Sequence, residues 1–477
     1  MLAVSLVGVW AASRPAIIDR RWAPEPPSFT EHYFLVVGKS RGGRVTAFVR
    51  NPEYNAGAFI KLRAVGVAAS AVTLRALGRA DIEGRLEGGT LIFPTLVDGP
   101  PLRFHRALPQ DFRWFYPSPT TSWTYREPTA GADGWPVGRL SDVGMRVAPI
   151  ATVMNRIVAL RTPSLRSPYV QSISIERHGR LVVDQYFYGF SPARLHDVRS
   201  AGKSVTTLMV GRAIEDTGAF SPRTRVLSLL PQYARVSNDG PRKRHITVAD
   251  LMTMSSGLAC DDNDDSSPGN EETMQSQPRG TDWYRYTLDL PMVAEPGTIA
   301  RYCTAGINLL GAIVYGTTGT PLDQYFARRF ARPMQFERYA MWLMPPPVGQ
   351  AYMGGGDYIR PRDFLKFGAL LLDRGRWRGR LIVDPRWIAQ SLIPRSAPTG
   401  ENDRYGYGWH ISRLSVDGTP YEAFSAGGNG GQLMIVVPAL DAAAMVTAGN
   451  YNQFPVWRHF LPAIVTALAR SCKALSR

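Results

Sequence analysis

Residues 198–209 read Val198-Arg199-Ser200-Ala201-Gly202-Lys203-Ser204-Val205-Thr206-Thr207-Leu208-Met209, and they place a serine three positions before a lysine. The apolar residues of this stretch recur at helical spacing, and Gly218 provides a stop signal. The pattern predicts a helix with Ser200 in its first turn. Because residues three apart share a helix face, we expect the Lys203 Nζ to reach the Ser200 Oγ.

Lysine is scarce in this chain: only six of its 55 basic residues are lysine. An ammonium group can lose its proton when it is desolvated, whereas a guanidinium group effectively cannot. Lys203 is therefore a candidate general base for Ser200. The alternative is a capping serine beside a solvated lysine, and the Ser-x-x-Lys pattern alone favours that alternative.

Length and composition indicate an ordinary globular protein of two domains. The chain has 477 residues, of which 44% are hydrophobic and 20% charged. Its formal charge of +16 would permit nucleic-acid binding, but the arginines are scattered and the longest basic run is 242–244. We therefore expect a solvated basic surface and no nucleic-acid partner.

The predicted domain organisation has four parts: an N-terminal segment (1–30), a β-rich domain (31–107), an interdomain segment (108–135) and a larger domain (136–477). Short apolar runs separated by turn residues predict an antiparallel sandwich or barrel in the β-rich domain. These runs are 32–37, 44–49, 58–62, 72–74, 89–93 and 102–104.

The apolar run 1–12 is too short to span a membrane, and it lacks the basic start of a signal peptide. A poorly formed signal peptide and a mis-annotated start both stay open, so export to the periplasm or beyond and a cytoplasmic location are both open too. No later run is long enough for an integral membrane segment.

The larger domain has α+β character. Helical spacing predicts helices at 143–160 and 361–372, and alternating apolar residues predict strands at 170–175 and 180–188, joined at His178-Gly179.

Several motifs occur along this domain, at 181–187, 200–204, 246–258, 295–298, 302–311 and 405–409. In this order they resemble the motifs of the serine β-lactamase and penicillin-binding-protein superfamily, closest to its class C-like branch of esterases, D-amino-acid peptidases and 6-aminohexanoate-dimer hydrolases. The resemblance implies a β-lactamase-like catalytic domain, with an antiparallel sheet flanked by helices and an all-helical part, behind a small β-rich domain.

The same resemblance implies the site. Ser200 is matched to the family's nucleophile, and Lys203 and Tyr302 to the pair that moves its proton. The backbone N–H groups of Ser200 and Gly428 are matched to an oxyanion hole. The segments that would contact substrate contribute Thr304, Ser425, Ala426, Gly427 and Asn429. No metal and no cofactor are implied.

Two departures from the family pattern bear on the substrate, which we expect to be a small molecule. Thr304 stands where the family usually has asparagine, and Ser425 stands where it has lysine or histidine. The missing cation removes a partner for a substrate carboxylate. We therefore expect an esterase or amidase that works through an acyl-enzyme. A β-lactamase or DD-peptidase is the first alternative, and a catalytically silent binding or scaffold protein is the second.

Three further features are less specific. The acidic stretch 261–272 is expected to be a solvated loop, since it lacks the spacing of a calcium loop. Cys260 and Cys303 flank the Tyr302 motif, and a disulfide between them would anchor the acidic stretch beside Tyr302 and favour an oxidising compartment. The loop 351–357 is similar to a segment that closes one side of the family's cleft. The sequence does not define the oligomeric state.

Overall fold

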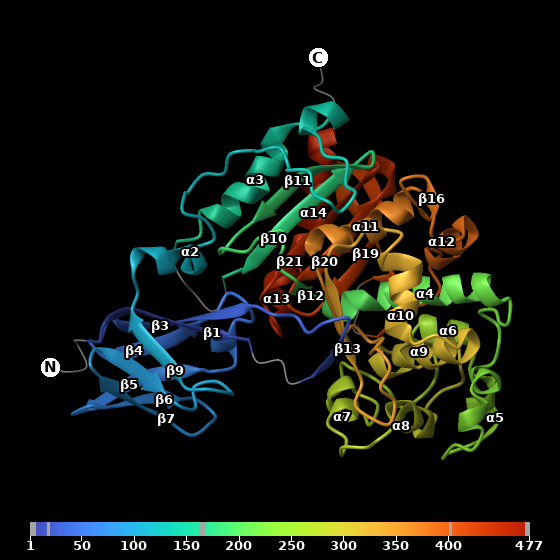
Figure 1. Cartoon of the computed structure of the whole chain (residues 1–477), viewed down its shortest axis with the longest axis horizontal. Helices are drawn as coiled ribbons and strands as arrows, with labels where there is room; N and C mark the ends of the chain where they lie inside the picture. The colour runs from blue at the N-terminus through green and yellow to red at the C-terminus, as the bar shows by residue number, and fades with distance from the viewer. Residues whose placement is uncertain (1–5, 17–19, 162–166, 400–402, 473–477) are drawn as a thin grey trace.

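The chain forms a β-rich unit and a larger α+β unit, which lie side by side (Figure 1). This computed structural model describes residues 6–16, 20–161, 167–399 and 403–472. Residues 1–5 of the N-terminal apolar run lie outside the described residues.

The β-rich unit is one antiparallel sheet of eight strands in the order β4-β3-β1-β9-β8-β7-β6-β5. The end strands β4 and β5 pack against each other, so the sheet curls around its own core. The strand bounds are β1 (Gly8–Pro15), β3 (Thr30–Lys39), β4 (Val45–Arg50), β5 (Leu62–Ala68), β6 (Ala71–Ala76), β7 (Ile82–Glu87), β8 (Thr90–Phe93) and β9 (Leu102–Arg106).

The structure differs from the sequence prediction at three places in this sheet. Strand β1 lies between β3 and β9, so residues 8–15 pair inside the sheet whose predicted start was residue 31. The predicted strand at 58–62 is instead a 3₁₀ turn (Ala56–Ala58) followed by the start of β5 at Leu62. Strand β7 was missed, because its single fully buried side chain, Ile82, leaves no apolar run to detect.

The larger unit is built on a seven-stranded antiparallel sheet in the order β11-β10-β21-β20-β19-β18-β17. Its strands are β10 (Val170–Arg177), β11 (Arg180–Tyr186), β17 (Arg404–Tyr405), β18 (His410–Val416), β19 (Thr419–Gly428), β20 (Gln432–Val437) and β21 (Ala442–Ala448). The predicted hairpin is therefore present as β10 and β11, with His178 and Gly179 at positive φ in the turn.

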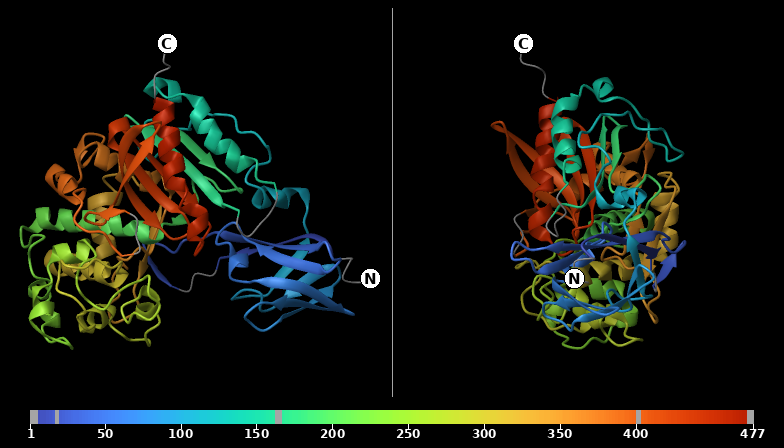
Figure 2. Two further views of the ribbon diagram at one scale, coloured as in Figure 1. Left: turned by 180° about the vertical axis from the view of Figure 1, so that it is seen from behind. Right: turned by 90° about the vertical axis from the view of Figure 1, so that its left-hand side faces the viewer.

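Helices cover both faces of this sheet. On one face, α3 (Val147–Val158) and α14 (Phe460–Cys472) lie side by side (Figure 2), and on the other lies α11 (Pro361–Leu372). Strand β20 shows why both faces must be covered. Leu433 and Ile435 belong to the core with α3 and α14, whereas Met434 and Val436 belong to the core with α11. An apolar strand buried on both faces has this alternation.

The all-helical part is built around α4 (Gly202–Thr217) and α9 (Thr304–Thr318), which pack on each other. It also contains α5 (Pro241–His245), α6 (Val248–Met252), α7 (Glu271–Gln275), α8 (Trp283–Asp289) and α10 (Leu322–Phe326) (Figure 1). The short helices outside it are α2 (Phe112–Phe115), in the segment between the two units, α12 (Pro385–Ser391), which contacts α4, and α13 (Phe454–Trp457), which precedes α14. The α+β class and the helical part agree with the prediction.

A small sheet in the order β12-β14-β13-β2 connects the N-terminal segment to the larger unit. Its strands are β12 (His196–Asp197), β14 (Asp357–Ile359), β13 (Tyr339–Leu343) and β2 (Arg21–Ala23). Trp22 of β2 pairs with Trp342 of β13. The chain thus leaves the β-rich unit after β1, adds an edge strand next to the Ser200 region, and returns to the β-rich unit as β3. A further two-stranded sheet consists of β15 (Arg376–Trp377) and β16 (Arg380–Leu381).

The buried carboxyl of Glu176 on β10 makes stability depend on pH. Its Oε2 accepts a hydrogen bond from the Gly179 N–H, and within the described part of the chain its Oε1 has no partner. Burial, and then the charge of Asp441, raise the pKa of Glu176 from its ordinary value to about 8. Between pH 4.5 and about 8, the folded state therefore keeps a proton that the unfolded chain releases. The free energy of unfolding decreases as the pH rises through this range.

We therefore expect Glu176→Gln, which cannot ionise, to lose less thermal stability than the wild type between pH 5 and pH 8. Each unit of pKa difference corresponds to about 1.4 kcal/mol. Thermal melts of both proteins at the two pH values measure the effect, and parallel losses would contradict it.

Candidate active site

The Ser200–Lys203 pair lies at the start of α4. Ser200 is in a 3₁₀ turn (Arg199–Ala201) that leads directly into the helix. The Lys203 Nζ donates hydrogen bonds to the Ser200 Oγ at 2.7 Å and to the Gly354 carbonyl oxygen at 2.8 Å. The predicted contact between the two side chains is therefore present, and the carbonyl fixes the amine in place.

The environment of Lys203 favours its neutral form. The side chain is 1% exposed, and burial lowers the pKa of its amine, whereas the charges of Glu271 and Asp262 oppose that change. A neutral amine can accept the proton of a serine hydroxyl. The Lys203–Ser200 hydrogen bond is thus suited to activating Ser200 as a nucleophile.

The backbone before Ser200 is held in an uncommon conformation. Arg199 has φ of 49°, in the left-handed region, and its guanidinium pairs with Asp197 at 2.8 Å. Gly355 and Gly428 pack directly on this turn, where a Cβ would overlap the carbonyl oxygen of Arg199 or of Val198 respectively. Both positions therefore require glycine, and Gly428 lies against the backbone on which Ser200 sits.

Tyr302 lies directly before Cys303, the residue that caps the start of α9, and its ring faces Lys203. The Lys203 Nζ is 5.0 Å from the centre of the Tyr302 ring, so the structure brings all three candidate catalytic residues together. On its other side, Tyr302 stacks with His410, with 6.4 Å between ring centres. His410 was not predicted as a site residue; its only signal is that it directly follows the 405–409 motif.

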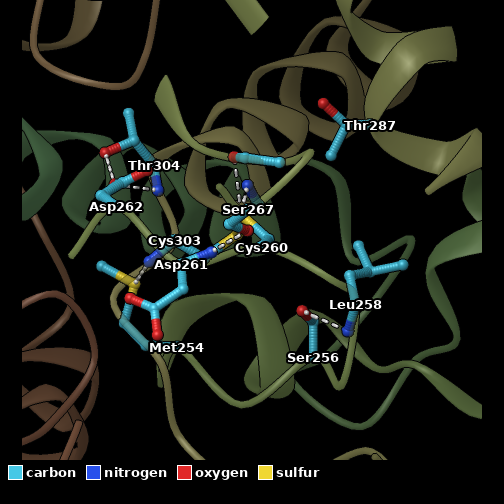
Figure 3. Close-up of a disulfide and its surroundings, with 12 residues drawn as sticks. Met254, Ser256, Leu258, Cys260, Asp261, Asp262, Ser267, Thr287, Cys303 and Thr304 are labelled. Carbon is cyan, nitrogen blue, oxygen red and sulfur yellow. Dashed lines mark hydrogen bonds between the residues drawn. A yellow bond between two sulfur atoms is a disulfide. The ribbon is translucent and has the colours of Figure 1, made fainter. Parts of the chain in front are cut away.

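The acidic stretch lies against the site, and the prediction of a solvated loop is wrong for much of it. Ser267, Gly269 and Asn270 are buried, and Asp261, Asp262 and Glu271 are partly buried. A disulfide joins Cys260 to Cys303 (Figure 3). Next to it, Asp262 accepts hydrogen bonds from the backbone and the hydroxyl of Thr304, and from the Glu271 N–H. Burial, and then the charge of Glu271, raise the pKa of Asp262 to about 6. Within the stretch, residues 263–266, Pro268 and Glu272 are exposed.

The residues predicted to contact substrate differ in burial and in whether they line the cavity. Thr304 is fully buried, and its hydroxyl is committed to Asp262. Ser425 and Ala426 are buried within β19, and Ser425 pairs directly with His410 on β18. An imidazole on the neighbouring strand therefore lies opposite the position where the family's cation is missing.

A cavity of about 420 Å³ opens beside Ser200. Asn429 lines it and is held by hydrogen bonds with Asn452, while Gly355 and Gly356 of the 351–357 loop line another side. Side chains of the N-terminal part line it as well, which the sequence did not predict. Gly427 is half-buried and is not part of this lining.

Residues 170–457 match the family model described as Beta-lactamase. The chain belongs to this family. The chain is also 24% identical over 297 residues to a 6-aminohexanoate-dimer hydrolase of Paenarthrobacter ureafaciens, covering 59% of this chain and 69% of that protein.

Two solved structures share the β-lactamase-like fold. A putative 6-aminohexanoate-dimer hydrolase from Bacillus anthracis has a TM-score of 0.54 at 17% identity, over 75% of this chain and 94% of that one. A putative β-lactamase from Bacteroides dorei has a TM-score of 0.53 at 16% identity, and the match covers 68% of this chain and 99% of that one. The family is one of serine hydrolases, which agrees with the predicted class of enzyme.

Among the residues that the structure describes, no group of three or more His, Cys, Asp or Glu side chains could hold a metal ion. None of the described helices combines the length and the apolar character needed to cross a membrane.

Proposed function

We propose that this enzyme cleaves an ester or amide through an acyl-enzyme on Ser200. The observation that carries the proposal is the 2.7 Å hydrogen bond from a buried lysine to the serine hydroxyl. A solvated surface lysine would stay protonated, whereas burial of Lys203 lowers the pKa of its amine. A catalytically silent scaffold would have no need for this arrangement.

In the proposed reaction, Lys203 and Tyr302 accept the Ser200 proton as the Ser200 Oγ bonds to the substrate carbonyl carbon. The N–H groups of Ser200 and Gly428 stabilise the oxygen that becomes negative. The bond to the leaving group then breaks, and the leaving group takes the proton. Water then attacks the acyl carbon while the Lys203–Tyr302 pair takes a proton from it. The bond from the acyl carbon to the Ser200 Oγ breaks, the proton passes to the Oγ, and the carboxylic acid product leaves.

The substrate contacts favour an ester or simple amide over a β-lactam. Ser425 supplies no positive charge for a carboxylate, and Thr304 is hydrogen-bonded to Asp262 instead of being free to bind an amide. The similarity to a 6-aminohexanoate-dimer hydrolase supports the same choice. The alternative, a β-lactamase or DD-peptidase, gains support only from His410 opposite Ser425.

We expect short-chain nitrophenyl esters to be hydrolysed with kcat/KM at least about tenfold above that of a chromogenic cephalosporin. A lost charge-assisted hydrogen bond is worth roughly 1.5–3 kcal/mol, which corresponds to about ten- to a hundredfold. Absorbance assays of both substrates measure the ratio, and Ser425→Lys should shift it toward the cephalosporin. A cephalosporin rate above the ester rate would favour the β-lactamase alternative.

A further inference from the structure

The cavity beside Ser200 has an aromatic wall made by the N-terminal segment and the larger unit. Trp22 and Phe29 come from the N-terminal part and pack on Tyr358, with ring centres 5.1 Å and 6.2 Å apart. On the other side, the rings of Trp342 and Tyr352 are 4.9 Å apart. The pairing of β2 with β13 places Trp22 at this wall.

Negative charge is concentrated in the same cavity, although the chain as a whole carries +16. Four carboxylates line it, at Glu31, Asp197, Glu271 and Glu272, against two guanidinium groups. Asp197 pairs with Arg199, and Glu31 pairs with Arg14 at 3.3 Å. Within the described ranges, neither Glu271 nor Glu272 forms an ion pair.

Hydrogen bonds hold the Glu271 carboxylate in the lining of the cavity that Ser200 also lines. Its Oε1 accepts hydrogen bonds from the Tyr352 hydroxyl at 2.8 Å and from the Gln275 amide at 3.0 Å. Both donors are neutral, so they orient the carboxylate without forming an ion pair with it. The charge of Glu271 also acts on Lys203, which places it within electrostatic reach of the Ser200–Lys203 pair.

The aromatic wall already holds cations of the protein itself. The Arg20 guanidinium lies over the Trp342 ring, 3.9 Å from its centre, and the Arg194 guanidinium lies 4.2 Å from the centre of the Phe29 ring. Arg20 is exposed at the cavity, whereas Arg199 is committed to Asp197. Aromatic faces with nearby carboxylates are the surroundings in which ammonium and quaternary ammonium groups are bound.

Given the proposed function, we propose that this cavity binds a positively charged group of the substrate. The group is an ammonium or quaternary ammonium that lies next to the scissile carbonyl. Trp342, Tyr352 and Glu271 would contact it from the catalytic unit. Trp22 would contact it from the N-terminal segment, which thereby acts as a determinant of specificity. Arg20 occupies part of the same surface and competes with the ligand.

The test compares a pair of nitrophenyl esters of equal size, one with a terminal trimethylammonium group and one with a neutral tert-butyl group. A second pair consists of alkyl esters of one acid whose alcohols end in a trimethylammonium or a tert-butyl group, and the released acid is followed by titration. It detects a preference on the other side of the carbonyl. We expect the cationic ester of at least one pair to have a kcat/KM about tenfold or more above its neutral partner.

Three variants sharpen the comparison, with the cationic-to-neutral ratio as the readout. Removing one negative charge by Glu271→Gln should lower the ratio about tenfold. Arg20→Gln should raise the ratio, because it removes the competing guanidinium. Asp265→Asn, which removes a charge from the exposed middle of the acidic stretch outside the cavity, should leave the ratio unchanged.

Binding without turnover separates this inference from the proposed function. Calorimetric titration of Ser200→Ala should show tighter binding of a cationic ester than of its neutral partner, and added salt should weaken the difference. Equal binding of both esters would overturn the inference even if the neutral ester is hydrolysed by the wild type. A different outcome is possible: Ser200→Ala binds the cationic ester more tightly, while the wild type neither hydrolyses esters nor is labelled at Ser200. That result would overturn the proposed function and support the cation site.

Discussion

The Ser200→Ala variant should lose at least about 10⁴-fold in kcat toward nitrophenyl esters, because the nucleophile of the reaction is gone. Its fold should survive, since the change removes one hydroxyl and leaves the Lys203 contact with the Gly354 carbonyl in place. Steady-state kinetics and a thermal melt of the same preparation measure the two properties.

A matched control is Ser228→Ala, which changes an exposed serine in the same unit. This variant should retain wild-type kinetics. Retained hydrolysis in Ser200→Ala would mean that another residue is the nucleophile. Loss of activity together with loss of the thermal transition would mean that Ser200 was needed for folding, which its position at the surface of the cavity gives no reason to expect.

The second large effect is expected at the proton-transfer pair. Lys203→Ala and Tyr302→Phe should each reduce kcat by several orders of magnitude, roughly 10²- to 10⁴-fold. The double variant should lose little more than the worse single one, since residues that act as a unit are strongly non-additive. Kinetics of the two single variants and the double variant with one ester provide the measurement.

Two conservative substitutions test the physical reason. Lys203→Arg keeps a positive charge but cannot act as a base, so it should be as inactive as Lys203→Ala. Tyr302→Phe keeps the ring that stacks with His410 and loses only the hydroxyl. Full activity in Tyr302→Phe would remove the phenol from the mechanism, and full activity in Lys203→Arg would show that Lys203 contributes only charge.

Much of the larger unit was predictable because its local signals agree with its tertiary environment. The helix predicted at 361–372 is α11 with the same bounds, and the strands around His178-Gly179 are β10 and β11. Strong periodicity and a turn with positive φ are local properties, so they can be read from one sequence. The contact of Lys203 with Ser200 was predictable for the same reason, as both belong to one helical turn.

The predictions that were wrong or missing concern contacts between residues far apart in the chain. The polar composition of 261–272 predicts solvent exposure, yet the disulfide and Thr304 draw Asp262 and Glu271 to the site. Likewise, Trp22 reaches the cavity only because β2 pairs with β13, more than three hundred residues away. Periodicity carries no information about such pairings. The contribution of the N-terminal segment to the aromatic wall could therefore not be predicted from the sequence.

Peptide mapping after covalent labelling shows whether Ser200 forms the acyl-enzyme. The wild-type protein is treated with an activated phosphonate ester that reacts with nucleophilic serines, digested, and analysed by mass spectrometry. We expect one major adduct on Ser200 and its loss in Lys203→Ala. An adduct on a different serine, or no adduct in protein that hydrolyses esters, would contradict this expectation.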